Sequence, residues 1–370
     1  MKRIESLTFL RFIAAFIVVM FHYGENTVIA NYANPFITAG PQMVSLFFVL
    51  SGFVMTVAYY NKNDWTLRDY YISRIARIVP VYLLALSLSV YLFYGVANNN
   101  LTALLLSLIF LQSWFPPYPL SLNTPAWSLS VEVLFYLTFP FVLFAIKKSN
   151  ISWKTLAILS LLFYFFTQAI LSNLLNVGFY RGYPSTSHDL IYYFPLSHYC
   201  SFLLGVSGGF VYAKHMDWFN KTGFLSFVIL MSALFVNYMS LQYPSTLTKM
   251  VGFPLAYSSS FYSLLFLLLI LSLAYSKNII TRIMSMPFFV LLGEASYSLY
   301  ILQKPLYNIY SVYISGYIYK YLKMSPDERF YFFVFLLVAI SIVSFYVIEK
   351  PGKQVILKLD AYLKEKTISV

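Results

Sequence analysis

The sequence has 370 residues, of which 60% are hydrophobic and 10% are charged. Soluble domains carry about a quarter charged residues, so this composition and a mean hydropathy of +0.71 exclude an ordinary soluble protein. The net charge of +12 would favour a nucleic-acid partner in a soluble protein. Membrane topology also places basic residues in loops, so no nucleic-acid partner is expected here. Cys200 is the only cysteine, which excludes an intramolecular disulfide framework and a cysteine-based metal cluster.

Ten apolar segments predict ten membrane-spanning helices and therefore an all-α, polytopic membrane protein. In chain order they fall at about 7–24, 41–60, 78–96, 128–146, 154–172, 193–213, 222–241, 255–275, 288–311 and 329–348. The stretch 101–115 is apolar but short. Counting it as a span would turn Lys147 and Lys148 outward. We therefore predict a re-entrant or interfacial segment within the outer loop 97–127.

The distribution of basic residues predicts the orientation. The outer segments of this topology hold only five of the 25 Lys and Arg residues, namely Arg181, Lys249, Lys320, Lys323 and Arg329. Most of the others fall in inner segments, which places both termini in the cytoplasm. The first span contains Arg11 and lacks a small-residue cleavage site, so we do not expect a cleavable signal peptide. We expect one transmembrane domain over residues 1–350 and a short basic, amphipathic cytoplasmic tail over 351–370.

The first span carries two polar residues, Arg11 and His22. Eleven helical steps advance about 16 Å and leave the two side chains about 20° from a whole number of turns, so they share one face. An Arg near the centre of a spanning helix costs about 2.5 kcal/mol or more, which favours a functional pair. The alternative is an Arg that reaches the lipid headgroups and a His that packs between helices.

The segment 70–82 holds Arg74 and Arg77, three residues apart on one helix face, followed by Pro80. Two guanidinium groups at the cytoplasmic mouth could bind a phosphate-rich ligand, because the guanidinium fork matches phosphate oxygens. The alternative is an anchor at the lipid headgroups.

The segment 123–140 carries Glu132, with Ser128 and Tyr136 on the same helical face. A carboxylate here could orient or charge the imidazole of His22 if the first and fourth spans pack together. The alternative is a structural partner of a buried Arg or Tyr.

The segment 291–306 has Glu294, Tyr297, Tyr300 and Lys304 at three- and four-residue spacing, which forms a polar stripe inside a span. Such a stripe is typical of a cavity wall, although Tyr stripes also serve in helix packing. Other patterns are missing: there is no GxxxxGK[ST] or GxSxG motif, and the spacing of the four His residues predicts no metal site. His188 and His215, in loops, are interpreted as ordinary surface residues.

Together these blocks resemble the acyltransferase family 3 membrane proteins, over nearly the whole chain from Leu7 to Pro351. The resemblance depends on Arg11 and His22 with ten residues between them, SLFFVLSGFVM (45–55), Arg74-x-x-Arg77-Ile-x-Pro80, WSLSVE (127–132), GEASYSLYILQ (293–303) and the closing Glu349-x-Pro351. One departure is Gln303, which stands where many relatives have a His.

The resemblance implies a bacterial enzyme of the cytoplasmic (inner) membrane that takes an acyl group from cytoplasmic acyl-CoA, with acetyl-CoA the expected donor. The acceptor would be a hydroxyl of a surface glycan, such as O-antigen or exopolysaccharide, or of its lipid-linked precursor. Membrane lipids are the expected surroundings, no metal is expected, and the oligomeric state is left open. The implied catalytic residues are His22, Arg11 and Glu132. Arg74 and Arg77 would bind the CoA phosphates, and Tyr297, Tyr300, Gln303 and Lys304 would line the substrate cavity.

Two rival functions fit the same composition. A transporter or flippase for a glycan or small metabolite would also have charged residues inside its spans. Inverted repeats and paired Gly or Pro breaks would favour a transporter, and the sequence has neither. A structural subunit of a glycan-assembly complex would tolerate loss of His22.

Overall fold

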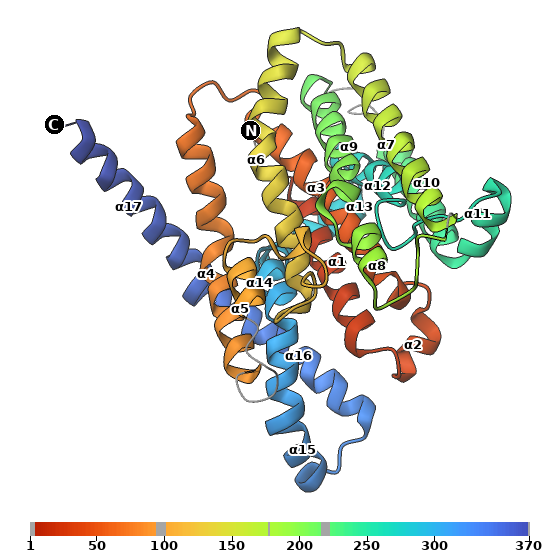
Figure 1. Ribbon diagram of the computed structural model, residues 1–370, viewed down its shortest axis with the longest axis vertical. Helices are drawn as coiled ribbons and strands as arrows, with labels where there is room; N and C mark the ends of the chain where they lie inside the picture. Colours follow the sequence, from red (N-terminus) through yellow and green to blue (C-terminus); the bar gives the residue numbers. More distant parts are fainter. Residues whose placement is uncertain (1–3, 94–100, 177, 216–222, 369–370) are drawn as a thin grey trace.

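The computed structural model describes residues 4–93, 101–176, 178–215 and 223–368, and within these ranges it contains helices and no strands. Figure 1 shows a bundle of helices from which one long C-terminal helix projects. In the part of the chain that the structure describes, seven helices are long and apolar enough to cross a membrane. The all-α, polytopic prediction is therefore confirmed, while the count of ten spans and the orientation stay predictions. Lys2, Arg3 and Lys221, which contribute to the charge pattern, lie outside the described residues.

Each of the ten predicted segments contains one principal helix. These are α1 (Glu5–Tyr23), α3 (Gly40–Tyr59), α4 (Leu67–Phe93), α6 (Trp127–Ser149), α7 (Trp153–Asn176), α9 (Pro195–Lys214), α10 (Gly223–Gln242), α12 (Ser263–Tyr275), α14 (Pro287–Ile309) and α16 (Pro326–Ser344). The predicted start of α4 at residue 78 is wrong by eleven residues, because charged side chains lower hydropathy without preventing a helix. The predicted start of α12 at residue 255 is also wrong, because turns occupy the chain up to Tyr262.

The remaining helices are shorter or flank the bundle. They are α2 (Val28–Ala33), α5 (Leu101–Leu108), α8 (Thr186–Tyr192), α11 (Pro244–Val251), α13 (Ile279–Met284), α15 (Ser315–Leu322) and α17 (Lys350–Ile368). Helix α5 has eight residues and advances about 12 Å, which is far less than the hydrocarbon core. Beyond it the chain packs on the start of α6, where Gln112 Nε2 donates to the Ala126 carbonyl at 2.9 Å. The stretch 101–115 is therefore not a spanning helix, as predicted.

Helix α1 packs against both α3 and α14. A Cβ atom on Gly293 of α14 would lie 2.2 Å from the carbonyl oxygen of Thr8, so only glycine permits the observed approach of the two helices. Gly52 of α3 likewise permits a close approach to α9, because a Cβ atom there would lie 2.2 Å from the Phe202 carbonyl oxygen. The contact at Gly293 holds α1 against α14 and places the later part of α14 beside the end of α1.

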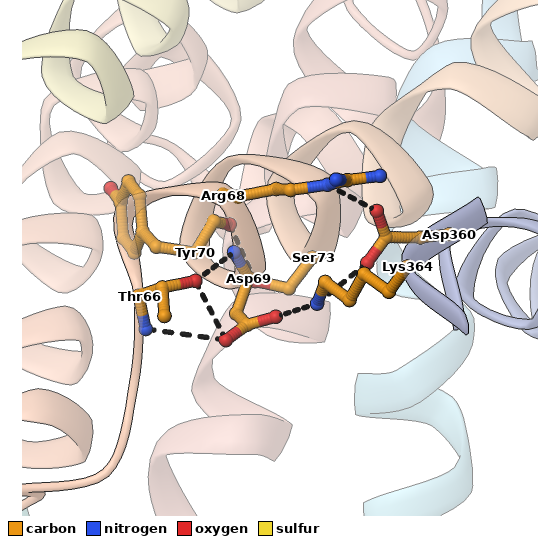
Figure 2. A network of polar contacts seen from close by, with 7 residues as sticks. All are labelled: Thr66, Arg68, Asp69, Tyr70, Ser73, Asp360 and Lys364. Carbon is orange, nitrogen blue, oxygen red and sulfur yellow. Dashed lines mark hydrogen bonds and ion pairs between the residues drawn. The ribbon is translucent and has the colours of Figure 1, made fainter. Parts of the chain in front are cut away.

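Helix α16 runs through a π-helical segment, Phe345–Glu349, into α17, which packs along the first half of α4. Figure 2 shows the polar network between these two helices. Arg68 Nε donates to Asp360 Oδ1 at 2.7 Å, and Lys364 Nζ contacts both Asp360, at 2.9 Å, and Asp69. The predicted C-terminal tail is therefore a helix that is tied to α4 by ion pairs.

Candidate functional site

Three adjacent cavities run through the bundle, and each is named here by its characteristic side chains. The lysine cavity has a volume of about 590 Å³, and its lining includes Arg11, Val54, Arg77, Glu294, Tyr297, Glu349, Lys350 and Lys353. The arginine cavity has a volume of about 80 Å³, and its lining includes Arg11, Ser51, Val54, Arg74, Arg77, Ser128, Glu132, Tyr136, Tyr297 and Tyr300. The histidine cavity has a volume of about 320 Å³, and its lining includes His22, Trp127, Tyr183, His188, Tyr192, Tyr193 and Tyr300.

The three cavities share walls. Arg11, Arg77 and Tyr297 line both the lysine and the arginine cavities. Tyr300 lines both the arginine and the histidine cavities. Helix α1 thus presents Arg11 to the first two cavities and His22 to the third. Arg11 and His22 therefore line different cavities, and their separate depths in the membrane stay a prediction.

His22 lies at the C-terminal end of α1, where its Nδ1 is 2.9 Å from Gln303 Oε1. Gln303 is fully buried, and its Nε2 donates to the Tyr300 carbonyl at 2.8 Å, which orients the amide oxygen toward the imidazole. An amide oxygen only accepts, so the proton of a neutral His22 lies on Nδ1. The lone pair is then on Nε2, which can act as a base or as a nucleophile.

Three guanidinium groups surround the arginine cavity: Arg11 from α1, and Arg74 and Arg77 from α4. Arg74 lies over the rings of Tyr59, Tyr70 and Tyr136 at 5.7 to 5.9 Å from their centroids, so cation–π contacts hold its position. Among the described residues that line this cavity, Glu132 is the only acidic one. The cavity therefore has an excess of positive charge and suits an anionic ligand.

Glu132 accepts hydrogen bonds from the Tyr136 hydroxyl, at 2.6 Å, and from Ser51 Oγ, at 3.3 Å. It lines the arginine cavity, whereas His22 lines the histidine cavity. The expectation that Glu132 orients His22 is therefore wrong in this structure. The orienting contact comes from Gln303, because α14 and not α6 packs against α1 at this level.

The polar stripe of α14 is in part a cavity wall. The Tyr297 hydroxyl donates to the Ile78 carbonyl at 2.8 Å, and the Tyr300 hydroxyl donates to Ser128 Oγ at 3.0 Å. Both rings face cavities. Gln303 and Lys304 are not among the described residues that line the three cavities, and Gln303 acts on the site through its hydrogen bond to His22.

Sequence reasoning missed several cavity residues, among them Lys350, Lys353 and His188. The two lysines were counted only as topology signals, although their place after Glu349 in the closing motif could have marked them. The interpretation of His188 as an ordinary surface residue is wrong, because its side chain is 13% exposed and lines the histidine cavity. The run of tyrosines around His188 was the available signal. Among the described residues, no group of three or more His, Cys, Asp or Glu could hold a metal ion.

Comparison with known proteins identifies the family of this chain. "Acyltransferase MdmB" of Streptomyces mycarofaciens is 34% identical over 151 residues, which covers 37% of this chain and 38% of that protein. A "Putative O-acetyltransferase" of Staphylococcus aureus (strain COL) is 23% identical over 391 residues, which covers 96% of this chain and 58% of that protein. The chain thus spans less than two thirds of the length of these relatives. No solved structure matches it. The model of the family described as "Acyltransferase domain" matches residues 4–349, so the chain belongs to the acyltransferase family 3.

Proposed function

We propose that this protein is a membrane O-acyltransferase that moves an acyl group, expected to be acetyl, from acyl-CoA to a hydroxyl of a surface glycan or its lipid-linked precursor. One observation carries the proposal. Three cavities with shared wall residues lie between a group of basic side chains and one imidazole, and a buried amide oxygen lies 2.9 Å from the Nδ1 of that imidazole. The names of the two relatives support the reaction class.

The donor would enter through the lysine cavity. CoA carries a diphosphate and a further phosphate, and Arg77, Lys350 and Lys353 line a volume of about 590 Å³ there. Arginine forks bind phosphate oxygens in pairs, and lysines add point charges. Arg11 lies on the wall shared with the arginine cavity, where it would hold the donor on its path to His22. Arg74 would keep the far wall of that cavity positive. Tyr297 and Tyr300 would line the passage.

Two routes use His22 Nε2. In direct transfer, Nε2 takes the proton of the acceptor hydroxyl while the oxygen of that hydroxyl attacks the thioester carbonyl. The C–S bond breaks, and the CoA sulfur receives that proton. In the covalent route, Nε2 attacks the carbonyl first, the C–S bond breaks, and CoA leaves as a thiolate that takes a proton from water. The acceptor hydroxyl then attacks the acyl group, the bond from that group to Nε2 breaks, and the hydroxyl proton passes through the freed Nε2 to water. Both routes need a neutral imidazole with its proton on Nδ1, which the Gln303 contact favours.

The test uses membranes that contain the wild-type protein, His22→Ala or Arg11→Ala, supplied with radiolabelled acetyl-CoA. We expect label in the glycan or lipid fraction for the wild type and loss of at least about 100-fold for His22→Ala, the range of general-base contributions. Arg282→Ala changes an exposed arginine that does not line the cavities, and serves as the matched control. A His22→Ala protein of normal abundance that transfers label at the wild-type rate would refute the proposal.

A carrier is the second candidate, because a row of cavities through a helix bundle also suits alternating access. Consumption of the thioester by purified protein separates the two functions. A carrier would move its solute without cleaving acetyl-CoA, whereas an acyltransferase would release free CoA thiol in proportion to the acylated acceptor.

A further inference from the structure

One wall of the histidine cavity is a continuous set of aromatic rings. His188 of α8 lies 5.0 Å from the Tyr183 ring and 4.7 Å from the Tyr192 ring, measured between centroids. The wall continues through Tyr193, whose ring is 5.4 Å from His188 and 5.0 Å from Trp127. All five side chains line the cavity. We call this set the aromatic wall.

The aromatic wall is held in place from outside the cavity. Ser185 caps the start of α8 by accepting from the His188 backbone N–H at 3.1 Å. At the end of α8, His198 Nε2 donates to the Tyr192 carbonyl at 3.0 Å, and the His198 ring packs on Trp127 with centroids 5.2 Å apart. The wall is therefore preorganised, which lowers the cost of binding a ligand.

His188 offers one ring nitrogen to the cavity. Its Nδ1 is buried and lies 3.7 Å from Asp189 Oδ1, which is longer than a hydrogen bond. Because Nδ1 has almost no accessible surface, Nε2 is the ring nitrogen that remains for a ligand in the cavity that His188 lines.

The charge of the histidine cavity differs from that of the lysine cavity. Among the described residues that line the histidine cavity there is no Lys, Arg, Asp or Glu. A phosphate-rich donor would find no counter-charge there, whereas a neutral polyhydroxyl molecule would find the phenol groups of Tyr183, Tyr192 and Tyr193. Its volume of about 320 Å³ is at the lower end of the range of about 300–1,000 Å³ for small-molecule sites.

We propose that the aromatic wall is the acceptor subsite and that it binds an uncharged sugar ring, an inference that depends on the proposed function. A sugar ring has apolar C–H faces that pack on aromatic rings and hydroxyl edges that take hydrogen bonds. Tyr183 and Tyr192 receive a C–H face. His188 bonds a hydroxyl next to the one that reaches His22, so it is a positioning residue.

The test measures initial rates in proteoliposomes that contain the purified full chain and saturating radiolabelled acetyl-CoA. The acceptor probe is the surface-glycan fraction of the bacterium that encodes this protein. Mild base removes its O-acetyl groups, and the fraction is added at increasing concentration. The variants are Tyr183→Ala and His188→Ala, and Tyr183→Phe is the conservative variant. Tyr183 is 65% exposed, so its loss leaves the core intact. Tyr32→Ala removes an 85% exposed tyrosine of α2 outside the cavity and is the matched control.

We expect Tyr183→Ala and His188→Ala to raise the half-saturating glycan concentration about three- to tenfold, the range for one aromatic contact or hydrogen bond. Tyr183→Phe keeps the stacking face, so it should raise the half-saturating glycan concentration less than Tyr183→Ala does. In a second series, at saturating glycan and increasing acetyl-CoA, the half-saturating concentration of acetyl-CoA stays the same in all variants. Unchanged glycan saturation in Tyr183→Ala and His188→Ala, or a shift in acetyl-CoA saturation instead, would overturn the subsite.

Failure of the proposed function gives a different result, in which the wild type transfers no label at any glycan concentration. The subsite is then tested by binding alone, with saturation-transfer NMR of the same glycan fraction. Signal transfer to sugar protons that is lost in Tyr183→Ala but kept in Tyr32→Ala supports the aromatic wall. Equal transfer in both variants, or none in the wild type, refutes it.

Discussion

Replacing Gln303 by Met isolates the contact that holds His22. Methionine keeps the length and approximate volume of the side chain but removes the oxygen that accepts from Nδ1 at 2.9 Å. A buried donor left without its acceptor costs about 1–3 kcal/mol, and each 1.36 kcal/mol in the barrier is a factor of ten. The imidazole must then be held in the productive tautomer without help. We expect kcat to fall by about fivefold to 150-fold, which is the cost of about 1–3 kcal/mol converted to a ratio of rates.

The half-saturating concentrations of acetyl-CoA and of glycan separate this role from a defect in binding or folding. Gln303 is not among the described residues that line the three cavities, so both concentrations stay within about twofold of the wild-type values. Gln303→Glu retains an acceptor oxygen and should recover part of kcat. Initial rates in proteoliposomes with radiolabelled acetyl-CoA measure kcat and the two half-saturating concentrations. A melting curve in detergent checks the fold. A Gln303→Met protein with wild-type kcat would show that His22 needs no such contact.

Three further predictions test the donor path and the packing. Arg77→Ala should raise the half-saturating acetyl-CoA concentration at least about tenfold, since a charge-assisted hydrogen bond is worth about 1.5–3 kcal/mol, and an unchanged value would exclude Arg77 from donor binding. Gly293→Ala should lower the melting temperature, because the new Cβ would lie 2.2 Å from a backbone oxygen of α1. Gly316→Ala is the control and should leave the melting temperature unchanged, because a Cβ there would meet nothing within 4 Å. Equal melting temperatures of the two variants would contradict the packing of α14 on α1. Lys364→Ala should speed hydrogen exchange in α17, where Lys364 contacts both Asp360 and Asp69, and exchange that does not change would show that other contacts hold this helix.

Most of the helices could be predicted from the sequence, because a spanning helix is a local property of about 20 apolar residues. The errors lie where hydropathy and helix formation diverge. The first turns of α4 carry Arg68 and Asp69 and are therefore polar, yet they are helical and pair with α17. Residues 255–262 are apolar enough to resemble a span but form turns before α12. Hydropathy measures transfer into lipid, and it does not record where the backbone hydrogen bonds begin.

The candidate site could be predicted along one helix but not between helices. Arg11 and His22 lie on the same helix, so their spacing alone predicts a shared face at two depths. The partner of His22 depends on which helix packs beside it, and two chemically reasonable candidates existed, Glu132 and Gln303. The choice depends on the close approach of α14 to α1 at Gly293, a contact that neither segment reveals alone. A glycine in a polar stripe is a packing signal only once its neighbour is known.

The partner of the imidazole also limits the chemistry that it can perform. A carboxylate beside Nδ1 would stabilise an imidazolium, whereas the amide oxygen of Gln303 carries no full charge and mainly fixes the tautomer. The only carboxylate that lines the arginine cavity among the described residues, Glu132, instead lies with three arginines and offsets part of their charge. Positive charge is therefore concentrated on the path proposed for the anionic donor, and the cavity proposed for the acceptor has no charged lining among the described residues. That separation would keep phosphate groups away from His22 while allowing a neutral hydroxyl to reach Nε2.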